Sequence, residues 1–106
     1  MPSFKDNTGR EWSIEITDAK AADVKDAIGV DLGIAKDIER ICDPRGQLSE
    51  FIDTLWVLCR GQHEECQDED FGRSLAEPRA LIQAFAAFFT AWMGFYFHKS
   101  IFAKVS

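Results

Sequence analysis

Basic residues are scarce in this sequence. Twelve lysines and arginines stand against eighteen aspartates and glutamates, which gives a formal net charge of -6. Recognition of nucleic acid through its phosphates needs a basic surface, so this balance disfavours nucleic acid as a partner. The acids gather in two short runs, Glu64–Glu65 and Asp68–Asp70. We interpret these runs as a solvated connector, and a docking patch for a basic partner is the alternative.

Cysteine is also scarce, and the N-terminus lacks a long apolar run. The three cysteines, Cys42, Cys59 and Cys66, are odd in number and irregularly spaced. Such a set disfavours the disulfide framework of a small secreted protein. Residues Met1 to Arg10 are mostly polar, so we expect no signal peptide. A reducing cytoplasm is the location that these features predict.

A convincing catalytic or metal-binding set is missing as well. Cys59, His63 and Cys66 could approach one metal, but zinc sites need four ligands, or three with a water, and closer cysteine pairs. A cysteine nucleophile needs a positioned base, and His63 is the only nearby candidate. We therefore expect no enzyme activity, no cofactor and no metal. The simpler interpretation places Cys59 in the core, and His63 and Cys66 on a polar loop.

The triplet Asp70-Phe71-Gly72 matches the metal-binding triplet of protein kinases. No glycine-rich loop, strand lysine or catalytic loop accompanies it, so a kinase is excluded. We interpret Phe71 as the residue that anchors a small helix in the core.

Internal repeats and low-complexity linkers are absent, and 106 residues suit one domain. Trp12, Ile14 and Ile16 alternate with polar residues after the turn formers Asp6 to Gly9. This period of two predicts an N-terminal β-hairpin. About four helices should follow in a single α+β domain over residues 1–106. They are expected at residues 18–28, 34–41 and 48–59, with a helical turn capped by Asp68 and a long aromatic helix from Pro78 to about Lys99 or beyond.

The expected last helix has no formally charged residue from Ala80 to Phe97. Its apolar residues form two neighbouring stripes and cover more than the roughly 100° arc that a surface helix buries. One stripe contains Leu81, Phe85, Phe88, Trp92 and Phe95, and the other contains Ile82, Phe89, Met93 and Tyr96.

Three environments for this helix remain open. It can be a central core helix, or it can keep an exposed remainder that binds a second copy or a partner protein, since large apolar patches mark interfaces. It can also enter a membrane, although about 18 uncharged residues reach only about 27 Å. As candidate partner-binding residues we name Phe85, Phe88, Phe89, Trp92, Met93 and Tyr96.

Three segments occur in an order that carries a family resemblance. They are the hairpin residues 4–12, the bend Gly29-Val30-Asp31-Leu32 and the stretch from Asp68 to Ala76, with Leu55 to Cys59 before the last. This order resembles small phage and prophage-like proteins of the tail-assembly-chaperone type, over roughly residues 4 to 90. The final segment departs from the resemblance, because members carry charged residues along their last helix.

The resemblance implies a non-enzymatic factor in the assembly of long-tailed phages. Such chaperones coat the hydrophobic tape-measure protein and help to recruit tail-tube subunits, in the cytoplasm of the bacterial host cell. We therefore expect a tail-assembly-chaperone-like protein that shields an apolar helical partner and forms homo-oligomers. A small homo-oligomeric adaptor that uses its C-terminal aromatic helix as the interface is the first alternative, and a membrane-associated protein is the second.

Overall fold

The computed structural model describes residues 1–43, 45–46 and 48–105, with side chains described as far as His98. Within these residues, a two-stranded antiparallel sheet, β1 (Ser3–Lys5) and β2 (Glu11–Ser13), is followed by five helices. The helices are α1 (Asp18–Ile28), α2 (Ala35–Ile41), α3 (Leu48–Cys59), α4 (Asp68–Ser74) and α5 (Pro78–Val105). The predicted α+β layout is confirmed, and the helical turn expected at Asp68 is the short helix α4.

The two strands of the hairpin are shorter than the stretch of sequence in which apolar and polar residues alternate. Phe4 pairs with Trp12 in register, and two further backbone bonds extend the ladder, Asp6 N–H to the Arg10 carbonyl at 3.0 Å and Ile14 N–H to the Pro2 carbonyl at 2.9 Å. Both Trp12 and Ile14 are fully buried, as the period of two predicts. Two strands are marginal alone, so burial of this face on the helices stabilises them.

Helix α1 begins and ends at the residues that its sequence indicates. The Thr17 hydroxyl accepts a hydrogen bond from the backbone of Lys20 at 3.2 Å, and Gly29 ends the helix with φ of 81°. Glycine adopts this left-handed conformation without steric cost. The bend that follows buries Val30 and Leu32 and leads directly into α2.

The start of α4 differs from the prediction by one residue. Gln67 is the N-cap and Asp68 is the first helical residue. The backbone N–H of Gln67 donates to the Asp70 carboxylate at 3.2 Å, in the manner of a capping box. Three acids in the first turn, Asp68, Glu69 and Asp70, still lie where the helix dipole favours them.

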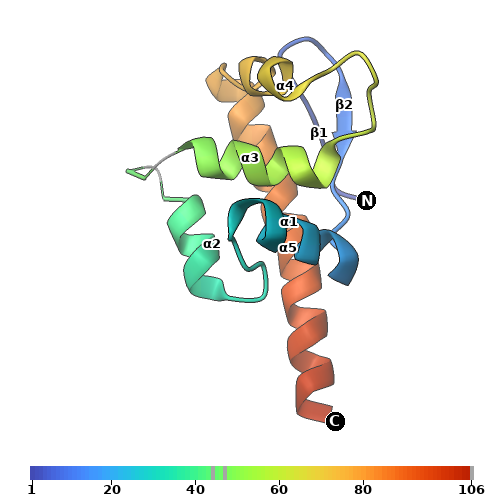
Figure 1. Cartoon of the computed structure of the whole chain (residues 1–106), viewed down its shortest axis with the longest axis vertical. Helices are drawn as coiled ribbons and strands as arrows, with labels where there is room; N and C mark the ends of the chain where they lie inside the picture. The colour runs from blue at the N-terminus through green and yellow to red at the C-terminus, as the bar shows by residue number, and fades with distance from the viewer. Residues whose placement is uncertain (44, 47, 106) are drawn as a thin grey trace.

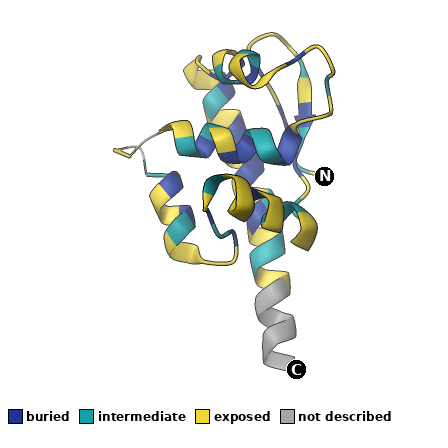
Figure 2. Ribbon diagram, viewed as in Figure 1, coloured by how far each residue is buried: buried dark blue, intermediate teal, exposed yellow. Residues whose placement is uncertain are grey.

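Helix α5 runs the length of the molecule, which measures 44 × 29 × 24 Å, and the other elements gather around its N-terminal half (Figure 1). Phe51 of α3 stacks on Phe85 with ring centroids 4.0 Å apart and meets Phe88 edge-on at 5.5 Å. Figure 2 shows the buried residues concentrated where α3 crosses α5. The C-terminal turns of α5 project beyond the other elements (Figure 1).

Candidate functional site

The hairpin turn holds a buried carboxylate, and its role is structural. Asp6 is 5% exposed and accepts hydrogen bonds from the Thr8 hydroxyl at 2.6 Å, the Thr8 backbone at 2.9 Å and the Trp12 indole at 2.9 Å. The Arg10 backbone and guanidinium complete its shell. Desolvation pushes the pKa of Asp6 upward, but these hydrogen bonds outweigh it and hold the pKa below the ordinary value of 3.8. A carboxylate so fully occupied is unsuited to proton transfer.

The outer edge of β2 is covered by side chains from the loop after α3. The Gln62 amide accepts from the Ser13 N–H at 2.9 Å and donates to the Ser13 carbonyl at 2.8 Å, as a neighbouring strand would. His63 Nε2 donates to the Glu11 carbonyl at 2.8 Å, and its ring meets Trp12 edge-on at 4.6 Å. His63 is therefore occupied in closing a sheet edge.

Two of the three cysteines are buried, and Cys42 is half-buried. Cys59 is fully buried, and desolvation raises the pKa of its thiol to about 12. Cys66 lies on the loop between α3 and α4, as predicted, but its side chain is only 3% exposed and packs in the core. Burial also raises the pKa of Cys42, to about 11. Among the described residues, no three His, Cys, Asp or Glu side chains form a group that could hold a metal ion.

The structure divides the six candidate partner-binding residues into two groups. Phe88 and Trp92 are core residues, and the Trp92 indole donates to the Leu32 carbonyl at 2.7 Å. Phe85 is half-buried against Phe51. Phe89 and Met93 are exposed, and Tyr96 is half-buried with its ring stacked on Trp92 at 4.9 Å. A partner can reach the second group without unfolding the domain.

Exposed apolar residues form a continuous stripe along α5, which we call the α5 seam. At 100° per residue, its members fall within an arc of about 80°. They are Ile82 at 66% exposure, the exposed Ala86, Phe89 at 47%, Met93 at 36% and Phe97 at 53%. Ile82, Ala86 and Phe97 were not among the six residues named from the sequence. Their position on the same helical face as Phe89 and Met93 identifies them only when the core-facing side of α5 is known.

An apolar hollow of about 320 Å³ lies beside the seam, between α2 and α5. Ala35, Ile38, Glu39 and Cys42 line it from α2 and the residue after it, and Phe89 and Trp92 line it from α5. No sequence signal indicates this hollow, because it depends on how α2 packs. It gives a partner side chain a place to insert next to the exposed stripe.

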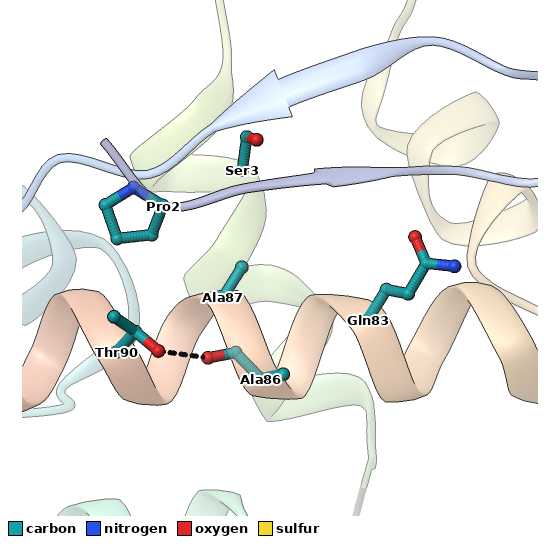
Figure 3. Close-up of a pocket in the computed structure, with 6 residues that line it drawn as sticks. All are labelled: Pro2, Ser3, Gln83, Ala86, Ala87 and Thr90. Carbon is teal, nitrogen blue, oxygen red and sulfur yellow. Dashed lines mark hydrogen bonds between the residues drawn. The ribbon is translucent and has the colours of Figure 1, made fainter.

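A second hollow, of about 330 Å³, lies on the other side of the seam, between β1 and α5. Figure 3 shows Pro2 and Ser3 facing Gln83, Ala86, Ala87 and Thr90 across it. The Thr90 hydroxyl donates to the Ala86 carbonyl at 2.9 Å, so it is satisfied within the helix. This hollow holds no titratable group, and it offers shape without a feature that selects a ligand.

Helix α5 also passes a test of length and composition for a membrane span. Within the described residues, Pro78–His98 is the one helix long and apolar enough to cross a bilayer, and 28% of its most apolar window is buried. Entry into a bilayer would require Phe88 and Trp92 to leave the core. The fold described here, with Phe88 and Trp92 in the core, and a transmembrane α5 are therefore different conformations.

Comparison with known proteins adds no relative. No protein-family model matches the chain, and no curated protein or solved structure matches it.

Proposed function

We propose that this protein is a non-enzymatic binding protein, of the tail-assembly-chaperone type, that shields an apolar helix of a partner protein. One observation carries the proposal. Phe89, Met93 and Phe97 remain exposed along α5 although the domain has a complete core of its own. Contiguous exposed apolar surface of this kind is typical of a protein interface.

The spacing of the seam suits a helical partner. Ile82, Ala86, Phe89 and Met93 follow one another at steps of four, three and four residues, which match the 3.5-residue repeat along which two helices pack side by side. Phe97 follows after a further step of four and stays on the same face. A partner helix with apolar residues at the same repeat would cover the stripe along its length.

The energy available is sufficient for a reversible complex. An aromatic ring left half-exposed offers on the order of 100 Å² for burial. Because covering apolar area contributes about 25 cal/mol per Å², each such ring adds about 2 kcal/mol before the entropy of association is subtracted. Two rings and a methionine on one face therefore support weak to moderate affinity, which a chaperone needs for release.

The charge distribution is compatible with shielding. All formal charges lie outside Ala80 to Phe97, and the whole chain carries a net charge of -6. Net charge of one sign keeps a protein soluble when it exposes apolar surface. The client helix contacts an uncharged stripe, while the acidic remainder keeps complexes apart. A tape-measure-like protein, which is long, helical and apolar, is the client class that fits.

The test is a binding titration with a defined client. The probe is a fluorescein-labelled peptide of three heptads with leucine at each a and d position, followed by fluorescence anisotropy. We expect saturable binding by the wild-type protein and a loss of at least tenfold in affinity for Met93→Glu, because a carboxylate in the seam is desolvated without a partner.

Leu48→Glu is the matched control. Leu48 is 41% exposed at the first residue of α3, far along the chain from the seam, and an acid is favourable at a helix start. This variant should bind the peptide like the wild type. Equal affinity of all three proteins, or no binding by any of them, would refute the proposed function.

A further inference from the structure

We propose that the hollow between α2 and α5 receives an apolar side chain of the client helix, and that a lysine or arginine beside that side chain pairs with Glu39. This inference rests on the proposed function and names the chemistry of its client. The partner is then an amphipathic helix that carries basic residues along the flank of its apolar stripe.

The α5 wall of the hollow has the form of a packing hole. Four residues stand at positions i, i+3, i+4 and i+7, a set that surrounds one side chain of a facing helix. They are Phe89, Trp92, Met93 and Tyr96. At 100° per residue, the centre of this set is turned from Met93 toward Trp92, which is the side on which the hollow lies. A helix that lies on the α5 seam therefore directs one side chain toward the hollow.

The hollow suits an apolar side chain. The Trp92 indole already donates its N–H to the Leu32 carbonyl at 2.7 Å. Burial raises the pKa of the Cys42 thiol to about 11, so this group stays uncharged near neutral pH. Ala35 and Ile38 add only hydrocarbon. The volume of about 320 Å³ exceeds the roughly 150 Å³ of an apolar cavity that binds benzene, so a leucine, methionine or phenylalanine side chain fits.

Of the described residues that line the hollow, Glu39 is the one that carries a charge. It is exposed on α2, and it forms no hydrogen bond or ion pair with another described residue. Arg40, the next residue, pairs with Glu50 instead, and Lys36, one turn earlier, forms no ion pair with Glu39. A carboxylate without a partner at the edge of an apolar hollow favours a ligand that brings a cation.

The remaining surface adds to this preference. Helix α5 has no formal charge from Ala80 to Phe97, so the charge that a client meets comes from the α2 side. The net charge of -6 attracts a basic helix from a distance, and salt screens this attraction. An acidic helix would meet repulsion both from Glu39 and from the chain as a whole. Charge therefore separates basic from acidic client helices of equal apolar content.

The first test compares two peptides that differ only in charge. Both keep the three heptads with leucine at a and d, and the flanking e and g positions are lysine in one and glutamate in the other. At low salt we expect the wild type to bind the lysine peptide about tenfold more tightly. Glu39→Gln should reduce this preference about threefold, because one ion pair with the peptide is lost.

Glu64→Gln is the matched control, since it changes the net charge by the same amount. Glu64 is exposed on the loop after α3, and this loop lies across the molecule from α2 (Figure 1). The control should keep the preference of the wild type. Equal affinity for the two peptides, or a preference that responds alike to both substitutions, would overturn this inference and leave the proposed function standing. Failure of both peptides to bind would overturn both proposals.

The second test asks whether the client occupies the hollow. The double variant Ala35→Cys, Cys42→Ser places one exposed thiol at the hollow, because Cys59 and Cys66 are buried. Saturating lysine peptide should slow maleimide labelling of this thiol at least tenfold. In the control, Glu64→Cys with Cys42→Ser, labelling should not change. A bound peptide that leaves labelling at residue 35 unchanged would overturn docking in the hollow.

Discussion

At the scale of single residues, Asp6 contributes more to the fold than its place in a turn suggests. Its two oxygens gather donors from Thr8, Arg10 and Trp12, and the side chain is fully enclosed. The sequence marks residues 6–9 as a turn, because Asp, Asn, Thr and Gly are turn formers. It gives no sign that the carboxylate reaches the indole, since that contact depends on the register of the strands.

We predict that Asp6→Asn lowers the free energy of unfolding by about 2–3 kcal/mol, because hydrogen bonds to a charged group are the strong ones. The amide would also place a donor against a donor of Trp12 or Arg10. Urea denaturation measures the change. Asp23→Asn, at an exposed position of α1, is the control and should be neutral within about 0.5 kcal/mol. Equal stability of the two variants would show that the Asp6 shell is dispensable.

The same carboxylate predicts a dependence on pH. Because the pKa of Asp6 is held below 3.8 in the folded protein, its contribution is complete above 3.8 and is lost as the pH falls through the lower, folded value. The stability difference between wild type and Asp6→Asn should therefore shrink in acid. Urea denaturation at several pH values measures this, and a difference that grows in acid would contradict the assigned direction.

Trp92 is the second residue for which the structure adds a contact. The sequence leaves it open between the core and a partner interface, and in the structure its indole donates to the Leu32 carbonyl at 2.7 Å. We predict that Trp92→Phe lowers the free energy of unfolding by about 2 kcal/mol, through the unpaired carbonyl and the smaller ring. Peptide affinity of the folded variant should change less than threefold. Thermal denaturation measures the stability. If it is unchanged, Trp92 does not stabilise the core and is available for contact with a partner.

At the scale of elements, local patterns predict where each helix lies but not which side faces inward. Thr17, Gly29 and Pro78 carry the signals that place α1 and the start of α5. In α5 the apolar residues surround most of the axis, so the core-facing side depends on α3 and on the bend before α2. Phe88 and Phe89 are neighbours in sequence, yet one is buried and the other is exposed. Cys66 lies on the predicted loop, and its burial depends on tertiary packing that no local pattern indicates.

No local sequence pattern indicates that the outer edge of β2 is covered by side chains. Gln62 imitates a strand with one amide, and it lies 49 residues after Ser13. We predict that Gln62→Ala speeds hydrogen exchange of the Ser13 amide by roughly tenfold, because two hydrogen bonds are lost. Nuclear magnetic resonance resolves this amide. The exposed Gln83→Ala is the control and should leave it unchanged. Equal exchange in both variants would mean that the edge is protected by other means.

At the scale of the whole molecule, the domain completes a core and still leaves apolar surface over. The core extends from Phe4 in the hairpin to Trp92 in α5, and it includes residues from every helix. The hollow beside α2 and the α5 seam lie together on the remaining surface. Satisfied buried polar side chains beside an uncovered apolar stripe are what the proposed binding function requires. The described residues contain no buried side-chain nitrogen or oxygen without a hydrogen bond.

The central claim is that partners bind the α5 seam. Hydrogen exchange with mass spectrometry, on the wild type with and without the heptad peptide, tests it most directly. We expect slower exchange in residues 89–98 of α5 when the peptide is bound, and no change in residues 64–70, the acidic stretch. Protection confined to the acidic stretch or to the hairpin, with α5 unchanged, would contradict the account.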